Sequence, residues 1–556
     1  MILNDRRVMT MTYVNIGFRR VIGLVVLFAA TFISGERGIA QVQEQEAPTM
    51  DTSSIREDAF NANGFRTGTI KAGGMKFVAP GSMAAPTTLG ATVGGAQDIG
   101  YARQLIESGR IPNFIDFSPE GLYSEHDIPT PAADCDEKLC LSLGYGFAPA
   151  ADTKQPALFI HLGMTSGIKP EDFRRPNLQL ALVIDKSGSM KGASMNAVKQ
   201  ALRSLVEKLG PEDILTLIAF NDNPELLLKP TEVKNKEAIL AAIDSLDADG
   251  GTNIEAGLIS GSSQLADLAE RKGYQKRVML FTDARPNIGR TDSGSFRTIT
   301  EGYAQQGIGL TAFGVGLDFG QELIYHISQL RGGNFFFLET PDKIARVFEK
   351  EFDYLVTPVV YDLRVNIKTP EGMKLVAVYG LPTWKPGDRD AELHVPTVFF
   401  SSNRGAIILR YERDDDSPLA FKRGDLLADG SLSYIDVDGR KYKTNAKLRH
   451  EAKVSLKPGV QFYTHEGMRI AVALTNVYFG LRDGCTLFTE GKKEEALDAI
   501  ARAQALVDLE NITLFDAGLK EEVALLEKLG KNIEQASVIE PSEGLKPFDV
   551  EKLPQR

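Results

Sequence analysis

The sequence predicts an α/β protein with a doubly wound, mostly parallel sheet, an added β-sandwich region and C-terminal helices. Apolar strand-like runs alternate with helical patterns across residues 177–355. Short strand patterns separated by turn signals follow in 356–466, and helical periodicity returns in 467–540. A chain of 556 residues is too long for one ordinary core, which favours several domains.

Residues 177–355 carry the strongest pattern. The strand-like runs are continuously apolar, as parallel strands buried on both faces must be. They lie at 178–184, 214–220, 278–281, 310–315 and 335–338. We expect helices near 193–209, 236–246, 253–270, 293–307, 320–331 and 341–355, and residues 224–233 could add an antiparallel edge strand.

The flanking regions show weaker patterns. In residues 98–175, a short amphipathic helix around 101–106 precedes strands within 139–165. In the predicted sandwich, Asp429-Gly430 and Asp438-Gly439 are dipeptides typical of hairpin turns. Residues 467–482 and 492–537 look helical, with one helix opening at 494–497 and another over 519–529. A tail occupies 541–556.

The first 40 residues resemble a signal peptide. Arg19 and Arg20 precede an apolar run over 21–33, and the small residues Gly38 and Ala40 follow. This run is shorter than the roughly 20 residues that a membrane span needs. We expect cleavage after about Ala40 and an exported, periplasmic or cell-envelope protein. The alternative is an uncleaved N-terminal anchor, which would be the chain's only membrane contact.

Composition and cysteines restrict the functional classes. The net charge of −11 argues against non-specific nucleic-acid binding, which needs a basic surface. Residues 41–97 are rich in Gly, Ala, Ser, Thr, Pro and Gln, and we expect a disordered linker. Cys135 and Cys140 could close a small disulfide loop in an oxidising compartment, or remain free thiols.

The motif that carries chemistry is Asp185-Lys186-Ser187-Gly188-Ser189. It follows an apolar strand directly and precedes a helix, which is where ligands bind in doubly wound sheets. Thr252 opens a helix after Gly250-Gly251, and Asp283 ends the strand at 278–281. These residues therefore fall on three comparable loops.

The ordered set Asp-x-Ser-x-Ser, Thr and Asp resembles the metal-ion-dependent adhesion site (MIDAS) of von Willebrand factor A (VWA) domains. All five positions are filled, by Asp185, Ser187, Ser189, Thr252 and Asp283. The resemblance covers about 177–355 and implies a VWA fold that binds a metal ion. The flanking regions also resemble, more loosely, bacterial exported VWA proteins of the YfbK-like type.

The chemistry of these side chains agrees with a divalent cation. All five are oxygen ligands, which suit a hard ion such as Mg²⁺, with Mn²⁺ or Ca²⁺ as alternatives. Three are neutral hydroxyls, so the ion stays electrophilic and keeps a position open for a Glu or Asp carboxylate of a protein partner. Two other interpretations stay open: Asp185, Ser187 and Ser189 could merely cap a helix, or the metal could serve stability alone.

The sequence thus favours a non-enzymatic, cation-dependent binding or scaffold protein. It holds no His-Glu-x-x-His pattern, Gly-x-Ser-x-Gly elbow or Walker loop. The alternatives are a metal-dependent hydrolase, which needs a general base that the sequence does not reveal, and a membrane-complex assembly component. Asp247 and Asp249 could form a second cation site but more often such residues make turns. The oligomeric state stays open.

Overall fold

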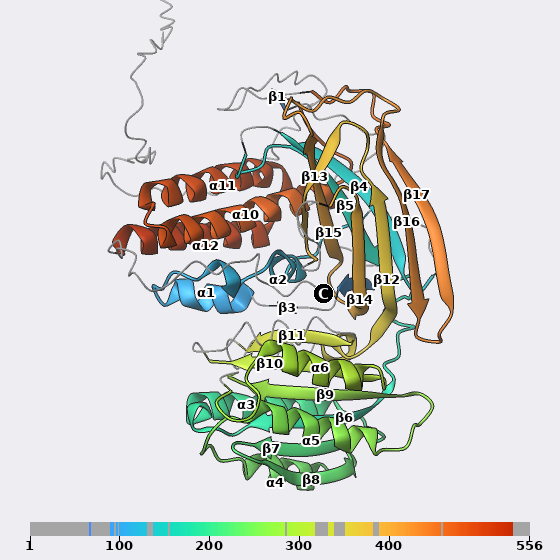
Figure 1. Ribbon diagram of the computed structural model, residues 1–556, viewed down its shortest axis with the longest axis vertical. Coiled ribbons are helices and arrows are strands. Elements are labelled where there is room, and N and C mark those ends of the chain that lie inside the picture. The colour runs from blue at the N-terminus through green and yellow to red at the C-terminus, as the bar shows by residue number, and fades with distance from the viewer. Residues whose placement is uncertain are drawn as a thin grey trace, which may run out of the picture. The chain divides into compact units, whose positions relative to one another are not determined.

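The computed structural model (Figure 1) describes only part of the chain. The described residues are 66–67, 89–93, 96–97, 99–130, 137–153, 156–283, 286–316, 332–338, 348, 351–381, 388–457 and 460–536. Residues 1–57 and 58–556 form two units, and all described residues belong to the second. The predicted signal peptide, most of the linker, Cys135, the helix at 320–331 and the tail 541–556 lie outside the described residues.

A seven-stranded sheet forms the centre of the α/β region. Every neighbouring pair is parallel except β7–β8, where β8 forms the antiparallel edge strand that the sequence suggests. The chain adds β7 on one side of β6 and β9 on the other, so the winding direction switches at β6. In spatial order the strands are β3 (Ala96–Gln97), β11 (Gly333–Leu338), β10 (Ile308–Val315), β9 (Tyr274–Thr282), β6 (Asn177–Asp185), β7 (Ile214–Phe220) and β8 (Pro224–Glu232).

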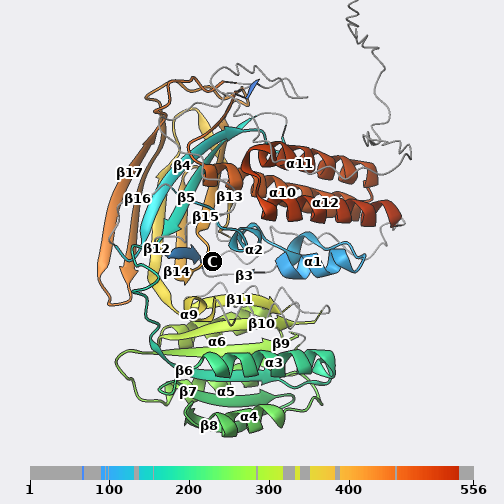
Figure 2. The ribbon, with the colours of Figure 1, turned by 180° about the vertical axis from the view of Figure 1, so that it is seen from behind.

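Helices cover both faces of this sheet, as a doubly wound fold requires. On one face, Val198 of α3 (Ala193–Lys208) and Ile239 of α4 (Lys236–Asp244) join a core with the strands. On the other, Leu258 of α5 (Ile254–Ala266) and Phe296 of α6 (Ser293–Ala304) join a second core. In Figure 1, α5 and α6 lie in front of the sheet. In Figure 2, which is seen from behind, α3 lies in front of it. The predicted α/β fold is confirmed.

A β-sandwich packs around a separate core of buried aliphatic and aromatic residues. Antiparallel pairing links one layer in the order β18-β4-β5-β15-β13 and the other in the order β2-β14-β12-β16-β17, and one pair, Gly90↔Thr165, joins β2 to β5. A short strand β1 (Arg66–Thr67) pairs with β18. The strands are β2 (Gly90–Val93), β4 (Cys140–Ala148), β5 (Ala157–Thr165), β12 (Pro358–Lys368), β13 (Met373–Tyr379), β14 (Ala391–Ser401), β15 (Gly405–Arg413), β16 (Leu426–Asp436), β17 (Lys441–Arg449) and β18 (Val460–Tyr463).

The sandwich differs from the prediction in its composition. We expect it from residues 356–466 alone, yet β2, β4 and β5 come from the region before the α/β sheet. The reason is that β5 is buried almost throughout, so the backbone N–H and C=O groups on both of its edges need hydrogen-bond partners. Strands β4 and β15 supply them. The α/β region is therefore inserted between strands of one sandwich.

One of the two predicted hairpins is wrong. Asp438-Gly439 does form the turn between β16 and β17, with the N–H of Gly439 donating to the Asp436 carbonyl at 3.0 Å and φ of +82° at the glycine. Asp429-Gly430 instead lies inside β16. A Cβ at Gly430 would stand 2.8 Å from the Asn366 carbonyl oxygen, so this glycine permits close approach of β12 rather than a turn.

Three long helices follow the sandwich and pack with the helices of residues 99–124 in a third core. They are α10 (Glu466–Thr489), α11 (Lys493–Leu514) and α12 (Ala517–Gln535), with α1 (Ile99–Glu107), η1 (Phe114–Asp116) and α2 (Pro119–Ser124) beside them. The described chain also contains the short helices η2 (Gly188–Met190) and α9 (Phe352–Leu355). Within the described residues, no helix is both long and apolar enough to cross a bilayer. Cys140 is disulfide-bonded, and Cys485 is free and buried.

Candidate metal centre

The three loops that carry the predicted ligands meet at one end of the α/β sheet. Strands β6, β7 and β9 run parallel, so their carboxyl ends lie at the same edge, at the switch point of the sheet. The N–H of Gly188 donates to the Gly250 carbonyl at 3.0 Å, and the N–H of Asp249 donates to the Lys186 carbonyl at 2.7 Å. These bonds hold the turn after Asp185 against the loop that carries Thr252.

The Asp185 carboxylate is fully buried and held from two sides. Its Oδ1 accepts from the N–H of Ser187 at 2.9 Å, and its Oδ2 accepts from Oγ1 of Thr282 at 2.6 Å. The hydroxyl oxygens of Ser187 and Ser189 lie 3.1 Å apart. Ser187 is buried whereas Ser189 is exposed, so this turn leads from the interior to the surface.

Thr252 stands between the Asp185 turn and the loop after β9. Its N–H donates to Oδ1 of Asn287 at 2.9 Å, and its carbonyl accepts from the N–H of Asn287 at 3.0 Å. The next residue, Asn253, caps α5 by accepting from the N–H of Ala256 at 3.1 Å. The Thr252 side chain is buried, and its hydroxyl bonds to no group in the part of the chain that the structure describes.

Asp283 supplies the second carboxylate. Only 7% of it is exposed, and its buried Oδ1 has no hydrogen-bond partner among the described residues. Burial raises the pKa of Asp185 to about 6, with hydrogen bonds from Thr282 and Ser187 opposing and the nearby Asp283 charge adding to the rise. Neither carboxylate forms an ion pair with a Lys or Arg of the described chain. Two buried acids therefore share a region without a protein cation.

These residues fit a bound cation. A buried carboxylate oxygen without a partner is costly, and a divalent ion would remove that cost for both acids. The set of two carboxylates and three hydroxyls contains only oxygen, which suits Mg²⁺ and similar hard ions. No group of three or more His, Cys, Asp or Glu side chains fit for a metal occurs among the described residues, in keeping with a site of two acids. That the five residues ligate a metal stays a prediction.

Several residues that fix these loops were not predicted from the sequence. Oδ1 of Asp222 accepts from the N–H of Gly251 at 2.8 Å, and Nδ2 of Asn221 donates to Oδ1 of Asp249 at 2.9 Å. Asn221 and Asp222 directly follow the apolar run of β7, and that position was the available signal. Oδ1 of Asp247 accepts from the N–H of Ala248 at 3.0 Å. Asp247 and Asp249, the two acids that could mark a second cation site, thus both form hydrogen bonds that shape these loops.

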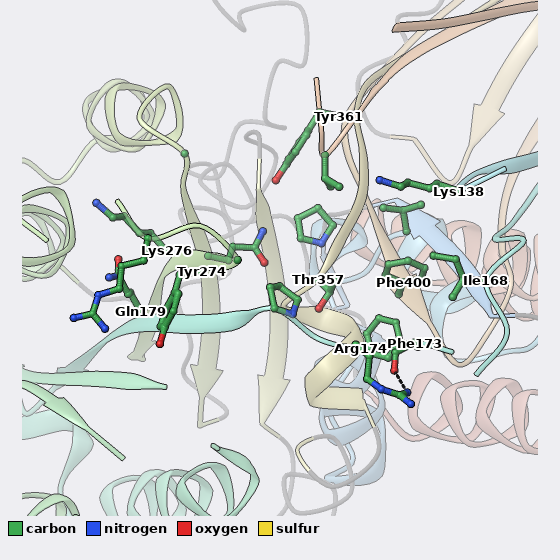
Figure 3. A pocket seen from close by; sticks show the side chains of 18 of the residues that line it. Lys138, Ile168, Phe173, Arg174, Gln179, Tyr274, Lys276, Thr357, Tyr361 and Phe400 are labelled. Atoms are coloured by element: carbon green, nitrogen blue, oxygen red, sulfur yellow. Dashed lines mark hydrogen bonds between the residues drawn. The ribbon is translucent and has the colours of Figure 1, made fainter. Parts of the chain in front are cut away.

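A separate pocket of about 690 Å³ lies at the other end of these strands (Figure 3). Tyr274 and Lys276, at the start of β9, line one side, and Thr357, Tyr361 and Phe400 of the sandwich region line the other. None of the five predicted ligands borders it. This pocket has no local signal in the sequence because it forms between segments distant in sequence.

Residues 179–350 match the von Willebrand factor type A domain. The chain is 26% identical over 265 residues to the uncharacterized protein YfbK of Escherichia coli K12, covering 47% of this chain and 44% of YfbK. It is 31% identical over 207 residues to the uncharacterized protein sll0103 of Synechocystis, covering 36% of this chain and 47% of sll0103. It therefore spans less than half the length of these relatives.

Among solved structures, the von Willebrand factor type A protein from Catenulispora acidiphila aligns over 72% of this chain and 91% of its own, with 15% identity and a TM-score of 0.46. The sequence match falls on the seven-stranded sheet with its helices and includes the Asp185, Thr252 and Asp283 loops. Residues 179–350 thus form a von Willebrand factor type A domain.

Proposed function

We propose that this protein binds protein partners through a divalent cation held by the VWA domain and is not an enzyme. The observation that carries the proposal is the pair of buried carboxylates, Asp185 and Asp283, without a cationic side chain among the described residues beside them. Ser187, Ser189 and Thr252 supply neutral hydroxyls at the same loops. A cation so held has charge left to attract an outside ligand.

The partner would offer a Glu or Asp carboxylate. A bound Mg²⁺ keeps water in open positions and exchanges it for an anionic oxygen. The surface position of Ser189 and of the exposed residue Gly250 leaves room for a partner to approach. Because the carboxylate would neutralise the ion, partner binding and metal binding strengthen each other, and this coupling is reciprocal.

An affinity capture from an envelope extract tests this proposal. The native chain and the Asp283→Ala and Ser187→Ala variants are immobilised in parallel, with Mg²⁺ or with EDTA. Asp247→Ala is the matched control, because Asp247 is an exposed acid of the Thr252 loop whose side chain, among the described residues, accepts a hydrogen bond from the N–H of Ala248. We expect a partner on the native chain and on the control in Mg²⁺ alone. A partner that stays bound in EDTA would show that no metal bridge exists.

The location and the enzymatic alternative have their own tests. We propose export to the periplasm or cell envelope, supported by the apolar run at 21–33 after Arg19 and Arg20. N-terminal sequencing of the mature protein would distinguish a cleaved signal from the retained anchor that a membrane-complex component needs. Turnover of generic ester, phosphate or peptide substrates that depends on Mg²⁺ and on Asp283 would overturn the non-enzymatic proposal.

A further inference from the structure

The outermost strand of the sandwich, β17, has one open edge. It pairs with β16 along its whole length, from Lys441 opposite Ile435 to Arg449 opposite Leu426. No strand of the described chain pairs with its other edge. An open edge presents N–H and C=O groups that an added strand can use for ladder hydrogen bonds.

The two faces of β17 differ in chemistry. Because side chains alternate along a strand, residues 441, 443, 445, 447 and 449 share one face, and all five are exposed. Four of these five are cations: Lys441, Lys443, Lys447 and Arg449. On the opposite face, Tyr442 and Leu448 pack partly buried against the sandwich core. The strand is therefore cationic outside and apolar inside.

Part of the outer charge has no counter-ion among the residues that the structure describes. Lys447 pairs with Asp429 at 3.2 Å, and Arg449 donates to the Gly424 carbonyl at 2.8 Å. Lys441 and Lys443 form no ion pair within the described residues. On the nearby strand β12, Arg364 and Lys368 are also exposed and extend the cationic face. This concentration stands out in a chain of net charge −11.

A groove lined by both apolar and polar side chains lies beside the inner face of β17. It has a volume of about 300 Å³ and lies between the start of β4 and the strands β16 and β17. The rings of Tyr434 and Tyr442 stack on one wall with centroids 4.8 Å apart. The lining consists of Glu137, Leu139, Leu141, Leu432, Tyr434, Tyr442, Lys443 and Thr444. If another strand were added beside β17, its apolar side chains on the core side would enter this groove.

We propose that β17 accepts an added strand from a partner protein, an extended peptide whose side chains alternate between apolar and acidic. Its backbone would bond to the open edge of β17. Its apolar side chains would enter the groove beside Tyr442, and its acidic side chains would lie next to Lys441 and Lys443. This site is separate from the metal loops, and the proposal does not rest on the metal-dependent function.

Lysines on an edge strand also serve to prevent edge-to-edge association. That role explains the outer cations, but it does not explain a groove lined by three leucines and two stacked tyrosines on the inner side of the same edge. The two interpretations make opposite predictions: a guarded edge rejects every strand, whereas a recognition edge accepts one of matching charge and rejects one of like charge.

The test uses the full chain and a fluorescently labelled peptide, acetyl-Ser-Val-Asp-Leu-Glu-Val-Asp-Gly-amide, with Lys in place of Asp and Glu in the control peptide. Binding is followed by anisotropy, and amide hydrogen exchange locates it. The variant Lys441→Glu/Lys443→Glu removes the outer cations. The matched control, Lys520→Glu/Lys531→Glu, makes the same charge change at exposed positions of α12.

We expect the acidic peptide alone to bind, to protect residues 441–449 from exchange, and to bind as well in EDTA. Charge reversal at Lys441 and Lys443 should weaken its affinity by roughly tenfold, while the α12 variant leaves it unchanged. Thermal unfolding checks that both variants fold. Absence of protection in 441–449, or equal weakening by the two variants, would overturn the proposal.

Discussion

Thr282 donates a hydrogen bond of 2.6 Å from its Oγ1 to Oδ2 of Asp185, and both side chains are fully buried. Thr282 is the last residue of β9, and Asp185 is the last residue of the neighbouring strand β6. The bond fixes one carboxylate oxygen, while Ser187 holds the other through its N–H. Thr282 therefore orients a predicted ligand without being one of the five.

Thr282→Val should weaken Mg²⁺ binding by about 10- to 100-fold, the usual cost of losing a hydrogen bond that orients a metal ligand. Valine keeps the shape but leaves Oδ2 of Asp185 without its donor. Isothermal titration with Mg²⁺ measures the effect. Thr216→Val is the control, because the buried Thr216 hydroxyl of β7 has no partner among the described residues. Equal affinity in both variants would show that Thr282 does not orient Asp185.

The buried ring of His161 should make the folded protein less stable in acid. Its ring is fully buried beside His465, with centroids 5.5 Å apart, and neither ring nitrogen has a hydrogen-bond partner in the described residues. Burial lowers the pKa of His161 to about 3 and that of His465 to about 4. The unfolded chain gains protons on these rings below about pH 6.5, whereas the folded chain does not.

Stability is therefore full above pH 6.5 and falls as the pH drops towards the folded pKa values. His161 alone should cost about 1 to 2 kcal/mol by pH 5.5. Urea unfolding of the native chain and of His161→Gln between pH 7.5 and 5 measures this slope. The variant should lose less stability across that range than the native chain does.

Phe515 occupies a conformation that suits glycine. It ends α11 with φ of +52° and is 81% exposed, so its side chain gains little from packing. Phe515→Gly should raise the free energy of unfolding by about 0.5 to 1 kcal/mol, because left-handed backbone strains a residue with a Cβ. Ile512→Gly, three residues earlier within the helix and also exposed, should lower it by a similar amount.

Chemical denaturation of the two variants decides this point. If Phe515→Gly raises the free energy of unfolding and Ile512→Gly lowers it, the backbone at Phe515 is strained. A loss of stability in both would mean that Phe515 makes contacts that outweigh its backbone strain.

Much of the α/β region could be predicted because its signal is local. The strand at 214–220 has the predicted bounds, since its seven residues are all buried and six of them are apolar. The edge strand β8 lies where the sequence suggests it, and none of its residues is fully buried, as its place at the edge of the sheet allows. The order of Asp185, Thr252 and Asp283 along the chain was sufficient to predict that their loops meet.

Other features depend on partners distant in sequence. That β5 joins β15, some 250 residues later, has no local signature, so the sandwich was expected from 356–466 alone. Asp429-Gly430 has the composition of a turn, but its glycine serves contact with β12. Thr282 directly follows the apolar run at 278–281, and its bond to Asp185 appears only once β6 and β9 pair.

The most direct test counts the divalent cations that the folded chain binds. Equilibrium dialysis against Mg²⁺ or Mn²⁺ compares the native chain with Asp283→Asn, which keeps the shape of the side chain and removes its charge. We predict about one ion per native chain and an affinity at least about tenfold weaker in the variant. A native chain that binds no ion at millimolar concentration, or a variant that binds as tightly, would contradict a metal centre at Asp185 and Asp283.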